Sequence, residues 1–106
     1  MQTLLFKDIL PTLKDTSQIR QLELINEQGM FIDSIENVPG KSASVSIYYH
    51  VSSNGQINRA AAKQALQLYA EHTDDARQHP GKHPNIDRLF DLIDNNLTFQ
   101  VKVINR

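Results

Sequence analysis

The chain has 106 residues, of which 40% are hydrophobic and 22% are charged, and its formal net charge is −1. This size and composition predict one folded domain over residues 1–106. Its 11 Lys and Arg are scattered among 12 Asp and Glu, which argues against nucleic acid as the main partner.

Cysteine is absent from the sequence, which excludes disulfides, thiolate zinc sites and a cysteine nucleophile. The beginning of the chain carries Lys7, Asp8 and Lys14 and has no long apolar run, so it does not have the pattern of a signal peptide. No stretch approaches the roughly 20 apolar residues that span a bilayer. We therefore expect a cytoplasmic protein that does not enter a membrane.

The N-terminal segment predicts a short helix within residues 3–16. Pro11 requires this helix either to begin near Asp8 or to kink, because proline cannot donate a backbone hydrogen bond. Four apolar side chains have the i, i+3, i+4, i+7 spacing of one helical face: Phe6, Ile9, Leu10 and Leu13.

A β-hairpin is predicted next. Two apolar-rich runs, residues 19–25 and 30–35, flank the four-residue segment 26–29, which ends in glycine. A second turn is expected at Pro39-Gly40, where proline supplies a fixed negative φ and glycine can adopt a positive one.

Residues 44–52 predict a third strand, because apolar and polar side chains alternate along them. Val45, Ile47, Tyr49 and Val51 form the apolar face in this interpretation. Tyr48 and His50 are then expected on the opposite, exposed face.

The second half of the chain predicts two helices and a final strand. One helix follows Asn58, which is a good N-cap, and continues until Pro80-Gly81. Another begins at Pro84, where a missing N–H costs nothing. The last strand covers residues 97–103, with alternate residues facing the core.

Together these elements predict an α+β fold in the order α-β-β-β-α-α-β. We expect a two-layer sandwich of about four mostly antiparallel strands with three helices on one face.

Three of the four histidines lie in one short window. His72, Asp75 and His79 share one flank of the predicted helix, and His83 could fold back across the Pro80-Gly81 turn. Imidazoles and a carboxylate suit a divalent metal such as zinc, nickel or iron. The alternative is that His79 and His83 only cap helix ends.

Tyr48 and His50 are a second candidate site. A Tyr–His pair on an exposed strand face can bind a partner or take part in acid–base chemistry. The alternative is a surface pair without function. No acidic residue lies beside His50 in the sequence, so a catalytic triad is not supported.

Two segments resemble a family of small uncharacterised bacterial proteins, classed as a domain of unknown function. They are residues 69–77 and 79–89, and the Tyr-Tyr-His ending of residues 45–50 is similar too. The resemblance implies a small soluble bacterial protein and carries no activity, cofactor or catalytic residue with it.

The four glycines are too far apart for a phosphate-binding loop, so no nucleotide cofactor is expected. We therefore favour a non-enzymatic module that binds a protein partner or itself, because a four-stranded sheet leaves at least two edges open. The alternative is a metal-binding protein or small metal-dependent enzyme that uses the histidine cluster. Whether the protein is an enzyme stays open.

Overall fold

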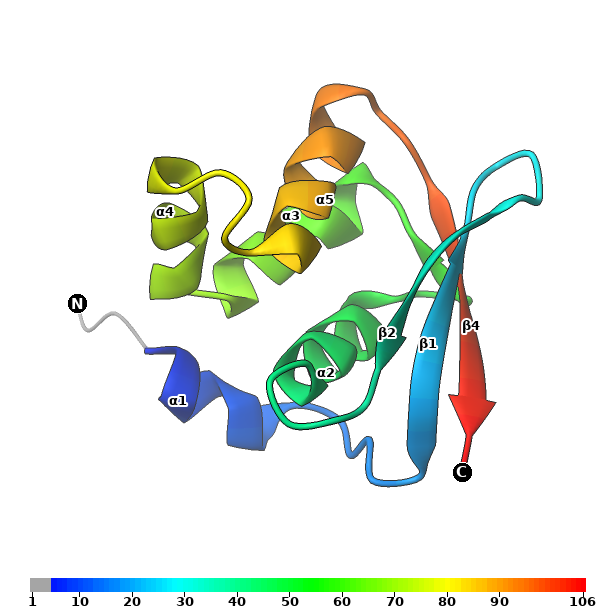
Figure 1. Ribbon diagram of the computed structural model, residues 1–106, viewed down its shortest axis with the longest axis horizontal. Helices are drawn as coiled ribbons and strands as arrows, with labels where there is room; N and C mark the ends of the chain where they lie inside the picture. The colour runs from blue at the N-terminus through cyan, green and yellow to red at the C-terminus, as the bar shows by residue number, and fades with distance from the viewer. Residues whose placement is uncertain (1–4) are drawn as a thin grey trace.

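A computed structural model describes residues 5–106 (Figure 1), and over these residues it contains five α-helices, one 3₁₀-helix and a four-stranded antiparallel sheet. The chain is therefore an α+β protein, as predicted. Its elements in chain order are α1 (Phe6–Ile9), η1 (Leu10–Thr12), β1 (Ile19–Ile25), β2 (Phe31–Glu36), α2 (Ser42–Val51), β3 (Gln56–Ile57), α3 (Arg59–Leu68), α4 (Glu71–Gln78), α5 (Pro84–Asp94) and β4 (Phe99–Asn105).

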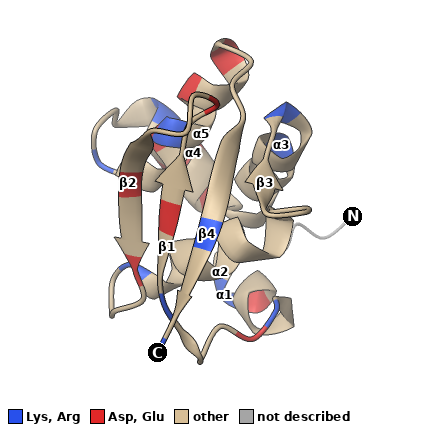
Figure 2. Ribbon diagram, turned by 90° about the vertical axis from the view of Figure 1, so that its right-hand side faces the viewer, with Lys and Arg blue, Asp and Glu red and all other residues tan. Residues whose placement is uncertain are grey.

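The sheet has the strand order β2-β1-β4-β3, and every neighbouring pair is antiparallel. The helices lie on one side of it (Figure 1), and its other face is seen from outside in Figure 2. Leu22, Leu24 and Val101 are buried on the side of the helices, whereas Gln100 and Lys102 are exposed. Alternation along β1 and β4 thus gives the sheet one apolar face.

The predicted hairpin is confirmed. β1 and β2 pair antiparallel with Leu22 opposite Ile35, and both of these side chains are buried. The side chain of Asn26 closes the turn by accepting hydrogen bonds from the backbone N–H of Gln28 and Met30. Asn at this position is favoured because its side chain can satisfy backbone donors of its own turn.

The predicted third strand is wrong, because residues 42–51 form helix α2. The helix packs against β1, β2, α3 and η1, so it is covered on several sides. Val45, Ile47 and Tyr48 are fully buried. A short apolar run that is buried all around has no single period, and it fits an alternating strand as well as a helix. The predicted order α-β-β-β-α-α-β therefore fails at its third strand.

The single helix predicted after Asn58 is two helices, α3 and α4. They are separated at Ala70, which has a φ of 52° and a ψ of −123°. No glycine or proline marks this break in the sequence, so local propensity did not reveal it. The start of α3 is as predicted, because the Asn58 side chain accepts a hydrogen bond from the N–H of Ala61.

The N-terminal helix, α5 and β4 agree with the sequence patterns, whereas β3 has no predicted counterpart. α5 starts at Pro84, and Gly81 before it has a φ of 93°. The N-terminal helix ends at Ile9, and Pro11 lies in the 3₁₀ turn that follows. The part of that prediction at residues 3 and 4 lies outside the described residues. Between residues 5 and 106, no helix combines the length and hydrophobicity that crossing a bilayer requires.

Candidate functional site

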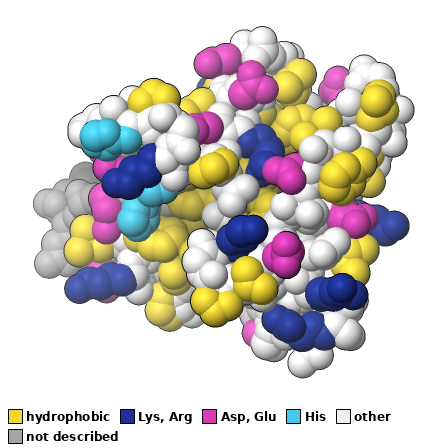
Figure 3. Space-filling model, in the orientation of Figure 1, with side chains coloured by type: hydrophobic (Ala, Val, Ile, Leu, Met, Phe, Trp, Pro, Cys, Tyr) yellow, Lys and Arg dark blue, Asp and Glu magenta, His cyan; other side chains and the backbone are white. Residues whose placement is uncertain are grey.

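Asp75 on α4 is the centre of the predicted histidine cluster. Its Oδ2 atom lies 2.6 Å from Nε2 of His83 and 3.0 Å from Nζ of Lys82. Nε2 of His79 lies 3.8 Å from Oδ1 on the other side of the carboxylate. The structure therefore brings together three of the four predicted residues, and the cluster lies at the end of the molecule remote from β4 (Figure 3). Lys82 is an additional member that the metal hypothesis did not include.

The carboxylate of Asp75 is ionised at neutral pH. Hydrogen bonds from His83 and Lys82 lower the pKa of Asp75 to about 2. A carboxylate can only accept hydrogen bonds, so Nε2 of His83 carries the proton that it donates to Asp75. The orientation of the His83 ring is thereby determined by Asp75.

His72, the fourth predicted residue, packs against aromatic rings. Its ring meets Phe6 edge-on with centroids 4.6 Å apart, and it lies 5.7 Å from the ring of His83. No group of three or more His, Asp or Glu side chains within residues 5–106 is arranged to hold a metal ion. The ammonium group of Lys82 lies 3.0 Å from the same oxygen of Asp75 that His83 contacts. Metal binding at His72, Asp75, His79 and His83 stays a prediction.

A cavity of about 240 Å³ opens beside this cluster, between α2 and the turn that leads from α4 into α5. His72, Lys82 and His83 line one part of it, and Ser44 of α2 lines another. The hydroxyl of Tyr69, which also lines the cavity, donates a hydrogen bond of 2.7 Å to Oγ of Ser44. Ser44 is a polar residue of this site that the sequence patterns did not single out.

Tyr48 and His50 do not form the exposed pair that the strand interpretation predicted. Tyr48 is fully buried, and its hydroxyl donates to the carbonyl oxygen of Asn85 at 2.5 Å. Burial raises the pKa of Tyr48 to about 12, against the opposing effect of nearby Arg88. His50 is half-buried and accepts a 3.3 Å hydrogen bond from the N–H of Lys14. The prediction of partner binding at Tyr48 and His50 assumed that both side chains lie on one exposed strand face, and the structure does not contain that face.

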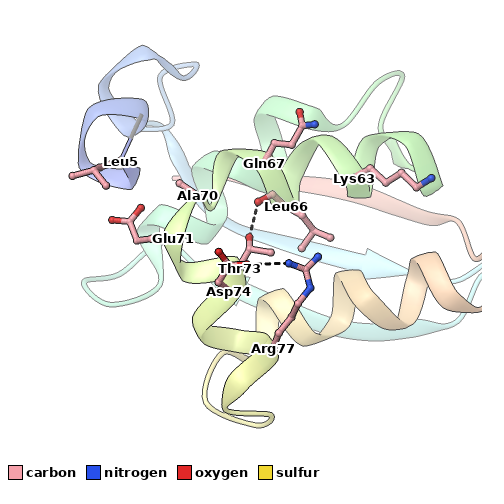
Figure 4. A pocket seen from close by; sticks show the side chains of 9 residues that line it. All are labelled: Leu5, Lys63, Leu66, Gln67, Ala70, Glu71, Thr73, Asp74 and Arg77. Atoms are coloured by element: carbon pink, nitrogen blue, oxygen red, sulfur yellow. Dashed lines mark hydrogen bonds and ion pairs between the residues drawn. The ribbon is translucent and has the colours of Figure 1, made fainter. Parts of the chain in front are cut away.

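Another hollow lies between α3 and α4 (Figure 4) and has a mixed lining. Asp74 pairs with Arg77 at 3.2 Å, and the hydroxyl of Thr73 donates to the carbonyl of Leu66 at 2.5 Å. Glu71 accepts a hydrogen bond from the backbone N–H of Phe6. Each of these four polar side chains thus has a partner within the protein, and both charge signs are present.

The edge strand β2 exposes a run of hydrophobic side chains. Phe31 is 61% exposed and Met30 just before it is 63% exposed. Ile32 and Val38 are also exposed, so four of the five exposed large hydrophobic residues within residues 5–106 belong to β2 and its flanks. Three consecutive apolar residues, 30–32, in the predicted strand 30–35 were the signal in the sequence, because a half-buried strand normally alternates.

The match between this chain and known proteins is at the level of a family. A family model described as "Uncharacterized protein conserved in bacteria (DUF2322)" matches residues 6–103, which include both the β2 edge and the cluster around Asp75. Comparison with curated proteins gave no match, and comparison with solved structures gave none.

Proposed function

The chain belongs to the family of uncharacterized bacterial proteins DUF2322, whose description names no activity, so we propose a function from the geometry: the protein associates with a second copy of itself through the edge of β2. The observation that carries this proposal is the hydrophobic run at Met30, Phe31 and Ile32 on a strand that has a single neighbouring strand within residues 5–106. Exposed apolar edges are ready surfaces for strand pairing.

The sequence of β2 suits antiparallel pairing with itself. When two copies pair around Ser34, Asp33 lies opposite Ile35 and Ile32 lies opposite Glu36. No like charges are then directly opposite, and the helical layers of both copies stay on the same side of the joined sheet. Pairing around Asp33 instead would bring two carboxylates face to face, which is destabilising.

The backbone N–H of Ser34 is not tied to the neighbouring strand and can take part in this pairing. This N–H is bonded to Oδ1 of Asp33 at 2.8 Å and not to β1. In a pair centred on Ser34, the N–H of Ser34 would no longer donate to the Asp33 side chain. It would donate instead to a backbone carbonyl oxygen of the second copy. Because a local acceptor competes for the amide, we expect reversible association in place of a permanent dimer. The net charge of −1 adds little repulsion between copies.

Sedimentation velocity over a range of protein concentrations tests the proposal. We expect a monomer–dimer equilibrium for the unmodified protein and a monomer for Ile32→Lys, because a charge on the edge opposes pairing. Leu5→Lys is the matched control, since Leu5 is an equally exposed hydrophobic residue outside the hairpin. The proposal is wrong if the unmodified protein is monomeric at every concentration, or if both variants dissociate equally.

A further inference from the structure

The cavity beside the Asp75 cluster differs in charge from its neighbours. Its lining contains the side chains of His72, Lys82, His83 and Ser44 and no aspartate or glutamate. The hollow between α3 and α4 has two acidic residues in its lining, and so does the adjoining hollow between α3 and α5. A lining that has the ammonium group of Lys82 and the hydroxyl of Ser44 and, within residues 5–106, no carboxylate favours a negatively charged occupant.

The hydroxyl of Ser44 is available to donate. Burial raises the pKa of Tyr69, so its hydroxyl keeps its proton and donates it to Oγ of Ser44. The hydrogen of Ser44 then points elsewhere, and among residues 5–106 it has no acceptor within hydrogen-bond distance. The Ser44 hydroxyl can therefore donate a hydrogen bond to an anionic oxygen of a ligand.

Asp75 positions the basic side chains without entering the cavity. Its carboxylate contacts Nε2 of His83 and Nζ of Lys82, and Asp75 is not one of the described residues that line the cavity. Lys82 has further N–H donors, because an ammonium group carries three. Since Nε2 of His83 carries the proton donated to Asp75, Nδ1 of the neutral ring is an acceptor and offers no hydrogen to an anion. Lys82 therefore retains donors for a ligand in the cavity.

We propose that this cavity binds a small organic anion through a carboxylate or phosphate group. Lys82 and Ser44 would contact the anionic oxygens. The rings of Phe6 and Tyr69, which also line the cavity, would pack against a short apolar body of the ligand. The volume of about 240 Å³ admits only a small molecule. This binding is independent of the proposed self-association, because the cavity and the β2 edge share no residue.

Titration of the folded protein with inorganic phosphate and, separately, with acetate tests the proposal by ¹H–¹⁵N NMR at constant ionic strength. We expect saturable shifts of the amide signals of Ser44, Lys82 and His83 with at least one of the two anions. Ser44→Ala and Lys82→Gln should each weaken binding by at least about tenfold, which is the loss expected for one hydrogen bond to a charged group. Lys63→Gln, which changes a lysine of the neighbouring hollow, should bind as the unmodified protein does.

The two anions distinguish the ligand classes. Saturation by phosphate alone indicates a phosphorylated ligand, and saturation by acetate alone indicates a carboxylic acid. Shifts that grow linearly with both anions overturn the proposal, and this outcome needs only the unmodified protein. Equal affinity of Ser44→Ala and the unmodified protein also overturns it, because the signal would then come from another site.

Discussion

Arg88 of α5 donates a hydrogen bond from Nη2 to Oδ2 of Asp33 on β2, which joins a helix to the edge of the sheet across 55 positions of the chain. Arg88 also donates from Nη1 to Oδ1 of Asn85 at 2.8 Å and to the hydroxyl of Tyr48 at 3.3 Å. Its side chain is only 13% exposed. One guanidinium group thus connects β2, α2 and α5.

Replacement of Arg88 by alanine should lower the free energy of unfolding by about 1–3 kcal/mol, because several hydrogen bonds of a mostly buried charge are lost together. Arg77→Ala is the matched control. Arg77 also pairs with an aspartate, but both partners are exposed, and such a pair contributes less than about 1 kcal/mol. Urea denaturation measures both losses. Equal losses would show that the Arg88 connection contributes no more than a surface ion pair.

Ala70→Gly should stabilise the protein. The backbone of Ala70 has a positive φ between α3 and α4, where a side chain costs energy and glycine is tolerated. We expect a gain of about 1 kcal/mol, which raises the midpoint of thermal unfolding by about 4–8 °C for a domain of this size. Ala61→Gly within α3 is the control and should destabilise by about 0.5–1 kcal/mol. A lower midpoint for Ala70→Gly would contradict the prediction.

Acid should remove the contribution of Asp75 to stability. The pKa of its carboxyl is about 2 in the folded protein, compared with 3.8 in the absence of these contacts. The folded state therefore binds fewer protons, and the contribution is complete above about pH 4 and disappears as the pH falls towards 2. Asp75→Asn should accordingly lose stability at pH 7 and depend less on pH in this window.

The neighbouring variant Asp74→Asn provides the control for this measurement, because within residues 5–106 the carboxylate of Asp74 is paired only with the exposed Arg77. Its unfolding free energy should follow that of the unmodified protein from pH 7 to pH 2. If the unfolding free energies of Asp75→Asn and of the unmodified protein change equally with pH, the contacts of Asp75 with His83 and Lys82 do not persist in solution.

Gly81→Ala should destabilise the protein by at least about 1 kcal/mol. Gly81 has a φ of 93°, which side-chain-bearing residues rarely adopt, and no atom crowds the position of a Cβ. The loss would therefore come from backbone strain alone. Gly81→Asn should cost less, since asparagine tolerates positive φ better than alanine. Thermal unfolding of the two variants makes the comparison, and an unchanged midpoint for Gly81→Ala would indicate a flexible turn.

Several elements were predictable because their energetic signals are local. The turn at Asn26 to Gly29, the N-cap Asn58 and the helix start at Pro84 each depend on residues a few positions apart. The meeting of His83 with Asp75 also belongs to this class, because only a short turn separates α4 from α5. For such features the sequence alone determined both the conformation and its place in the chain.

Tertiary structure decided the conformation of residues 42–51, the break at Ala70 and the composition of the cavity. α2 is enclosed by other elements, and a segment buried on several sides has no amphipathic period to reveal it. The positive φ of Ala70 opposes local preference, so only packing elsewhere can maintain it. Ser44 and Lys82 line one cavity although 38 positions separate them, and only the packing of α2 against the α4–α5 turn brings such distant donors together.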